Sequence, residues 1–161
     1  MPSFKTTRRV RHSAAEMFDL VADVERYPQF VPLCQALRIR RRTQEGEGIE
    51  VLIADMEVGY RAIKEKFTSR VTLDRPQLKV LVEYVDGPFS HLENIWRFTD
   101  EPAPSGSDQA YSRIEFFIAY QFKSRMLGAL MGSMFDAAFR KFAAAFETQA
   151  DVVYGHSERG A

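Results

Sequence analysis

The chain has 161 residues, with 22 basic and 22 acidic side chains and therefore no formal net charge. This length predicts one domain, and a hydrophobic share of 45% is enough for a sizeable core, which argues against wholesale disorder. Net neutrality removes the general electrostatic attraction to nucleic acid, DNA included, or to anionic lipid, although it permits local basic patches. With a single cysteine, Cys34, and three scattered histidines, neither an intramolecular disulfide nor a zinc-binding spacing is expected.

The first expected element is a strand over residues 4–12, with a basic exposed face. Ser13-Ala-Ala-Glu16 then matches a capping box, in which the serine hydroxyl and the glutamate satisfy free amides at a helix start. The apolar stripe of this helix runs to Val24, and the helix is expected to end at Tyr27-Pro28, because proline disfavours a helical residue before it. A second short helical or turn segment is predicted over residues 29–34.

The middle of the chain reads as a succession of strands separated by short breaks rich in Gly, Pro and Asp. Breaks this short join antiparallel neighbours, since a parallel crossover needs a dozen or more residues. The sequence therefore predicts an antiparallel meander with strands at about 35–44, 47–58, 60–73, 77–86, 89–99 and 110–122.

A long helix is expected from Ser124 to about Val152, because apolar residues recur there at intervals of three and four. Its wide apolar face indicates a helix lying inside a curved sheet. Gly128 and Gly132 either leave space beneath the helix or allow close packing, and the sequence does not separate the two. Residues 1–154 are expected to form the single domain, and residues 155–161 a disordered tail.

No apolar export signal is visible near the start, and the most apolar run, 126–139, is shorter than the roughly 20 residues that span a bilayer. We therefore expect a cytoplasmic location, with peripheral contact at the inner face of a bacterial cytoplasmic membrane as an extension of that expectation.

Candidates for catalysis are weak. Cys34 has apolar neighbours, which favours a buried, inert thiol over a nucleophile. His91 is a conceivable general base, and Asp55 with Glu57 a conceivable acid pair on one strand face, but exposed strand positions explain all three as well. No catalytic residue and no metal ligand is predicted.

Basic residues gather near two strands and are candidates for contact with phosphate groups of lipid or RNA. The second strand is expected to carry three of them on one face, and acidic residues of the following hairpin are possible partners that would leave an ordinary solvated edge. The candidates are Arg8, Arg9, Arg38, Arg40 and Arg42.

The most informative feature is the high content of aromatic residues and methionine, with 13 Phe, 6 Tyr, one Trp and 6 Met. They either fill a core solidly or line a cavity between sheet and helix. The expected lining residues are Leu92, Trp96, Phe116, Ile118, Tyr120, Met126, Leu130, Met134 and Phe142.

Three segments carry a family resemblance. The order βααββββββα resembles the START-like helix-grip fold, a curved antiparallel sheet of about seven strands around a long C-terminal helix. The sequence Val24-Glu-Arg-Tyr-Pro-Gln-Phe-Val-Pro-Leu-Cys34 resembles the signature of the coenzyme Q-binding START-like family. So do Asp86-Gly-Pro-Phe89, with Leu92 and Trp96-Arg-Phe98 after it, and Phe122-Lys-Ser-Arg125 before the Phe-rich helix.

This resemblance covers about residues 3–153. It implies non-enzymatic binding of ubiquinone or a related polyprenyl lipid in a tunnel between sheet and helix, in support of respiratory electron transport, and it adds Phe89 to the expected lining. The same family includes ribosome-association toxins that block subunit association, and a wider group of polyketide cyclases and dehydrases. These are the two alternative functions.

The segment from Tyr27 to Leu33 is expected at the entrance of such a tunnel, where two prolines make it rigid and its shortness limits its burial. Its side chains would either form a gate for the ligand or plug the core. The residues concerned are Tyr27, Pro28, Phe30 and Val31.

Overall fold

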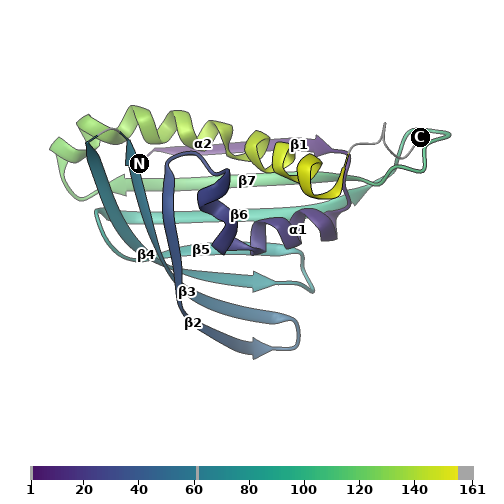
Figure 1. The fold of residues 1–161 in the computed structure, drawn as a ribbon, viewed down its shortest axis with the longest axis horizontal. Helices are drawn as coiled ribbons and strands as arrows, with labels where there is room; N and C mark the ends of the chain where they lie inside the picture. Colours follow the sequence, from purple (N-terminus) through teal and green to yellow (C-terminus); the bar gives the residue numbers. More distant parts are fainter. Residues whose placement is uncertain (1, 61, 156–161) are drawn as a thin grey trace.

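The computed structural model describes residues 2–60 and 62–155, and in them a seven-stranded antiparallel sheet carries its helices on one face (Figure 1). The sheet order is β1-β7-β6-β5-β4-β3-β2, so β2 to β7 form the predicted meander and β1 returns beside β7. This is the expected helix-grip arrangement. The elements are β1 (Ser3–Val10), α1 (Ala14–Ala22), the 3₁₀ helix η1 (Val24–Gln29), β2 (Cys34–Gly46), β3 (Ile49–Tyr60), β4 (Ile63–Asp74), β5 (Lys79–Asp86), β6 (Phe89–Glu101), β7 (Tyr111–Phe122) and α2 (Arg125–Tyr154).

The sheet is strongly bent. In Figure 1, β2, β3 and β4 run at an angle to β5, β6 and β7, and α2 lies along the face toward which the sheet curves. This inner face is lined by the large apolar residues of alternate strand positions, which the two-residue period of a strand requires. None of the helices in the described residues is long and apolar enough to cross a membrane.

The region between β1 and β2 differs from its predicted boundaries. The capping box is present, with the Glu16 amide donating to Ser13 Oγ at 3.1 Å, but α1 ends already at Ala22. The second helix is η1, and Pro28 lies inside it. This short helix tolerates Pro28 because the fixed φ of proline is compatible with a 3₁₀ turn. Residues 30–33 form turns and a bend, and no helix.

The C-terminal end of α2 is anchored to β1 and α1. Glu147 accepts from Arg8 Nε at 2.6 Å, and the buried His12 lies 2.7 Å from Asp151 through its Nε2. The Tyr154 hydroxyl donates to a backbone carbonyl of α1 at 3.1 Å. The opposite end of the helix carries the exposed Met126, so α2 is held most firmly at its last two turns.

Neither helical glycine is needed for close packing on the sheet. A Cβ on Gly128 would meet Phe122 at an ordinary 3.8 Å, and one on Gly132 would meet nothing within 4 Å. Gly132 also does not line the cavity described below. The cavity is therefore not space left beneath these glycines, and close packing on the sheet does not require them either.

Candidate functional site

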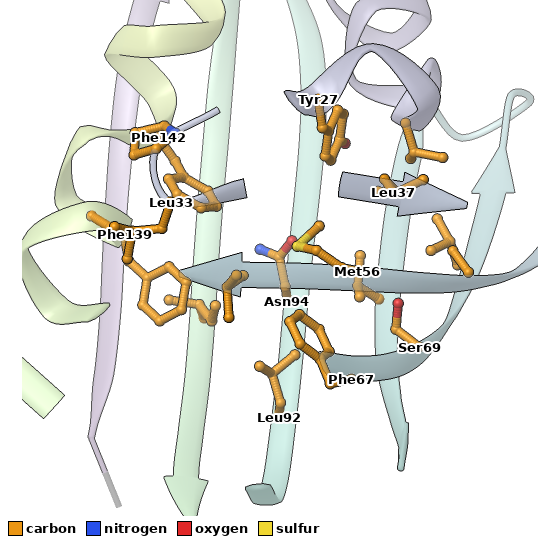
Figure 2. Close-up of a pocket in the computed structure, with 18 of the residues that line it drawn as sticks. Tyr27, Leu33, Leu37, Met56, Phe67, Ser69, Leu92, Asn94, Phe139 and Phe142 are labelled. Carbon is orange, nitrogen blue, oxygen red and sulfur yellow. The ribbon is translucent and has the colours of Figure 1, made fainter. Parts of the chain in front are cut away.

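A largely enclosed apolar cavity of about 80 Å³ lies between the inner face of the sheet, the segment from η1 to β2, and α2 (Figure 2). Every strand from β2 to β7 contributes to its wall. The lining residues are Val24, Tyr27, Pro32, Leu33, Leu37, Ala54, Met56, Val58, Phe67, Ser69, Val71, Val82, Leu92, Asn94, Trp96, Ile118, Phe135, Ala138, Phe139, Phe142 and Phe146.

Short side chains create this space. Ala54 of β3 and Ser69 of β4 are direct cross-strand partners on the inner face, and Ala138 lies on the buried face of α2. Larger residues at these positions would fill the volume, because protein interiors pack to a high density. Aromatic residues of α2 then form one side of the cavity, as Figure 2 shows for Phe139 and Phe142.

Two aromatic side chains of the cavity wall, Trp96 and Phe146, are at the centre of close ring contacts. Trp96 lies edge to face with Phe116 of β7, with ring centroids 4.6 Å apart, and with Phe146 of α2 at 4.9 Å. Tyr27 and Phe30 of the η1 region also pack edge to face on Phe146, at 5.3 and 4.9 Å. These contacts fix the helix, the sheet and the short segment to one another around the cavity.

Three polar side chains interrupt the apolar lining. The Tyr27 hydroxyl donates to the Val21 carbonyl, and burial raises the pKa of this phenol far above its ordinary range, so it stays neutral. Asn94 donates to the Phe117 carbonyl at 2.9 Å and accepts from Trp96 Nε1 at 3.0 Å. Ser69 is 5% exposed.

Five of the predicted site residues lie on the cavity wall: Tyr27, Leu92, Trp96, Ile118 and Phe142. Four others belong to the surrounding core without lining the cavity: Phe30, Val31, Phe116 and Tyr120. Pro28 is half-buried in η1 and does not line the cavity either. Phe89 is fully buried in a neighbouring aromatic cluster with Phe67, Tyr84 and Phe135, so it belongs to the solid core.

The prediction that Met126, Leu130 and Met134 line the cavity is wrong. Met126 is 72% and Leu130 58% exposed, and neither lines the cavity. Met134 lines only an outer groove. The helical period alone does not say which part of a wide apolar face meets the sheet, and the buried face here runs through Phe135, Phe139 and Phe146 instead.

The smaller lining residues could not be predicted from the sequence, because a small side chain in a strand forms no sequence pattern that marks it as part of a cavity. Ala54, Ser69 and Asn94 stand at alternate positions that the strand period places on the inner face, and that period was the one indication available.

An open groove of about 610 Å³ lies outside the cavity, between α2 and the ends of β3 and β4. Pro32, Leu33 and Ala138 line both the groove and the cavity, so the wall between them is a single layer of side chains. Leu33 has a φ of 68°, a left-handed conformation that is unfavourable for leucine. The exposed Leu130 and Tyr60 form the groove's outer rim.

Comparison with known proteins places this chain in a family. A family model described as polyketide cyclase / dehydrase and lipid transport matches residues 10–147. The chain belongs to this family. It is 34% identical to the ribosome association toxin RatA of Escherichia coli K12, over 96% of this chain and 90% of that protein. It is 33% identical to the mitochondrial coenzyme Q-binding protein COQ10 homolog B of Xenopus laevis, over 91% of this chain but 57% of that protein.

Solved structures agree with the fold. An 18 kDa protein of Caulobacter crescentus is 33% identical, with a TM-score of 0.74 over 97% of this chain and all of that one. A START superfamily protein of Mycobacterium smegmatis is 19% identical, with a TM-score of 0.64 over 94% of this chain and 98% of that one, and shows the same fold. The START-like resemblance is thereby confirmed.

In this member of the polyketide cyclase / dehydrase and lipid transport family, the basic residues do not form one surface. β1 and β2 are opposite edges of the sheet. A β-bulge at Arg40 shifts the register of β2, so Arg42 stands opposite the buried Leu52 on the inner face, and not on the face of Arg38. The predicted shared face of the three β2 arginines is therefore wrong for Arg42.

Most of these arginines have acidic partners, which the sequence presented as an alternative. Ion pairs among the described residues join Arg8 to Glu147, Arg9 to Glu101, Arg40 to Asp55, and Arg42 to both Glu50 and Glu25, at 2.6 to 3.7 Å.

The residues considered for catalysis lie away from the cavity. Asp55 is on the outer face of the sheet, where burial raises the pKa of its carboxyl, but bonds from Thr68 and Arg40 outweigh this and hold the pKa below its usual value. His91 precedes the inward-facing Leu92 and so belongs to the outer face. Burial raises the pKa of Cys34 to about 11. Among the described residues, no group of three or more His, Cys, Asp or Glu side chains could hold a metal.

Proposed function

We propose that this protein binds an isoprenoid quinone of the ubiquinone class in the cavity between sheet and α2, and that it does so without catalysing a reaction. The observation that carries the proposal is the enclosed aromatic cavity with a few polar groups on its wall, the usual composition of a small-molecule site. The relative named as a coenzyme Q-binding protein supports the ligand class.

The size of the cavity implies that the wall moves on binding. Its volume of about 80 Å³ is smaller than the roughly 150 Å³ of an engineered cavity that admits benzene. A quinone ring with its tail therefore requires displacement of part of the wall. The single layer formed by Pro32, Leu33 and Ala138 is the thinnest part, and the groove outside it offers apolar surface to the tail.

The energy of such binding is favourable. Burying about 400 Å² of apolar tail contributes on the order of 10 kcal/mol before association costs are subtracted. Micromolar affinity or better is then within reach.

Trp96 makes the proposal directly testable, because it is the chain's only tryptophan and it lines the cavity. Titration with decylubiquinone should quench its fluorescence saturably. Ala138→Leu, which fills the space, should weaken the quenching, whereas Ala129→Leu on the exposed side of α2 should leave it unchanged. Absence of quenching, together with no lipid in native mass spectra of protein purified from its own host, would contradict quinone binding.

A second candidate function is binding to the ribosome, favoured by the relatives named as ribosome association toxins, one of which matches over 90% of its length. The opposite placement of the basic edges means that one edge would make the contact. Sedimentation of lysates after overexpression should then show altered subunit profiles. Charge reversal at Arg38 and Arg40, compared with reversal at Arg9, would identify the edge, and an unchanged profile with the wild-type protein would refute the candidate.

A cyclase or dehydrase activity is the remaining alternative and is part of the family's description, but neither of its candidate residues, Asp55 and His91, lines the cavity.

A further inference from the structure

Two polar groups on the cavity wall have unused hydrogen-bonding capacity, and Ser69 is the first. Ser69 is 5% exposed and lines the cavity, and no hydrogen bond to its hydroxyl is present among the described residues. A buried hydroxyl without a partner costs stability, so such groups are normally paired. Figure 2 shows Ser69 at the wall among apolar neighbours such as Phe67.

Asn94 is the second polar group, and the structure orients it firmly. Its amide donates one N–H to the Phe117 carbonyl, and its carbonyl accepts from Trp96 Nε1. A carboxamide carries two N–H donors, so one remains available. Because both ends of the amide are held, the remaining donor has a defined direction and needs no rearrangement on binding.

The two groups stand on the same inner face of the sheet and line the same apolar space. Ser69 belongs to β4 and Asn94 to β6, with β5 between them. Ser69 stands beside Tyr84 and Asn94 beside Val82, so two strand spacings and an offset of two residues separate their backbones by roughly 12 Å. The width between them is therefore of the order of one ring with a polar atom at each end.

We propose that the Ser69 hydroxyl and the free N–H of Asn94 recognise the ligand's ring, so that the site selects an apolar ring with a hydrogen-bond acceptor on each of two opposite sides. A para-quinone meets this requirement, whereas a hydrocarbon tail alone does not. The inference rests on the proposed function and specifies which atoms provide its selectivity.

The test compares two probes with the same tail, decylubiquinone and decylbenzene. Quenching of Trp96 gives the first dissociation constant, and displacement of decylubiquinone by decylbenzene gives the second. Ser69→Ala should weaken decylubiquinone binding about three- to tenfold, the usual effect of one hydrogen bond, and leave decylbenzene unchanged. Asn94→Leu should reduce the ratio of the two affinities in the same direction, whatever its effect on stability.

Ser112→Ala is the matched control, since the Ser112 hydroxyl is buried and unpaired but does not line the cavity. It should change neither affinity. Unchanged decylubiquinone binding in Ser69→Ala, or equal losses for both probes, would overturn the inference and leave the proposed function standing. A wild-type protein that binds neither probe would overturn both.

Discussion

At the scale of single residues, burial sets the chemistry of the titratable groups near the cavity. Cys34 begins β2, is 6% exposed, and its thiol is 3.8 Å from the Ala36 carbonyl. Burial raises its pKa to about 11, because a thiolate there would lose its hydration. The same cause keeps the Tyr27 phenol neutral. Both groups therefore act as packing residues at neutral pH.

We predict that Cys34 reacts slowly with thiol reagents. With a pKa of about 11, its thiolate fraction at pH 8 is roughly two-hundredfold below that of an ordinary cysteine. The rate of labelling by Ellman's reagent in the native protein should be low at pH 8 and rise as the pH approaches 11. The protein unfolded in urea is the control, and rapid native labelling at pH 8 would contradict a buried thiol.

At the scale of elements, the segment from η1 to β2 has two parts with different roles. Tyr27 and Phe30 pack on Phe146 of α2, and the Tyr27 hydroxyl donates to the Val21 carbonyl, contacts that favour the plug interpretation for this part. Pro32 and Leu33 instead stand between the cavity and the groove. If the segment contains a gate, these two residues are in the position to form it.

We predict that Tyr27→Ala lowers the free energy of unfolding by about 3 kcal/mol, as truncation of buried aromatic side chains does. Tyr27→Phe removes only the hydroxyl and should cost about 1 kcal/mol. Gln29→Ala, at an exposed position of the same η1, is the control and should cost little. Urea unfolding curves measure all three, and a Tyr27→Ala protein of native stability that loses its ligand would indicate a gate there instead.

For Leu33 we predict a kinetic effect. Leu33→Gly removes a wall side chain and relieves the left-handed φ of 68°, so stability should change little while decylubiquinone dissociates faster. Stopped-flow recovery of Trp96 fluorescence measures this rate. Leu78→Gly is a matched control, since Leu78 has a φ of 49° in the turn between β4 and β5 and does not line the cavity. Equal dissociation rates in wild type and Leu33→Gly would place the entrance elsewhere.

At the scale of the whole molecule, the distribution of charge bears on ribosome binding, whereas the shape of the interior bears on lipid binding. The chain is neutral overall and its basic edges are separated by the width of the sheet, with ion pairs at several arginines. The cavity, by contrast, is apolar and is framed by an α2 that is anchored mainly at its C-terminal end. The less anchored end adjoins the groove through Leu130, so we expect any opening of the cavity to occur on this side.

We predict that decylubiquinone affinity changes less than about twofold between 50 and 500 mM salt, because apolar burial and neutral hydrogen bonds are little screened. Binding to ribosomal RNA through phosphate contacts would weaken steeply over the same range. Fluorescence titrations and ribosome co-sedimentation at both salt concentrations provide the comparison. A steep salt dependence of quinone binding would contradict an apolar site.

The sequence by itself determined the order of elements, the meander and the capped helix, because these follow from local periodicity, turn residues and a capping box such as Ser13 with Glu16. The segments that resemble the START-like family then identified the fold. Only the tertiary structure decided the inner wall, since the small size of Ala54, Ser69 and Ala138 becomes a cavity only where three elements meet. A bulge at Arg40, which no local pattern announced, likewise decided on which face Arg42 lies.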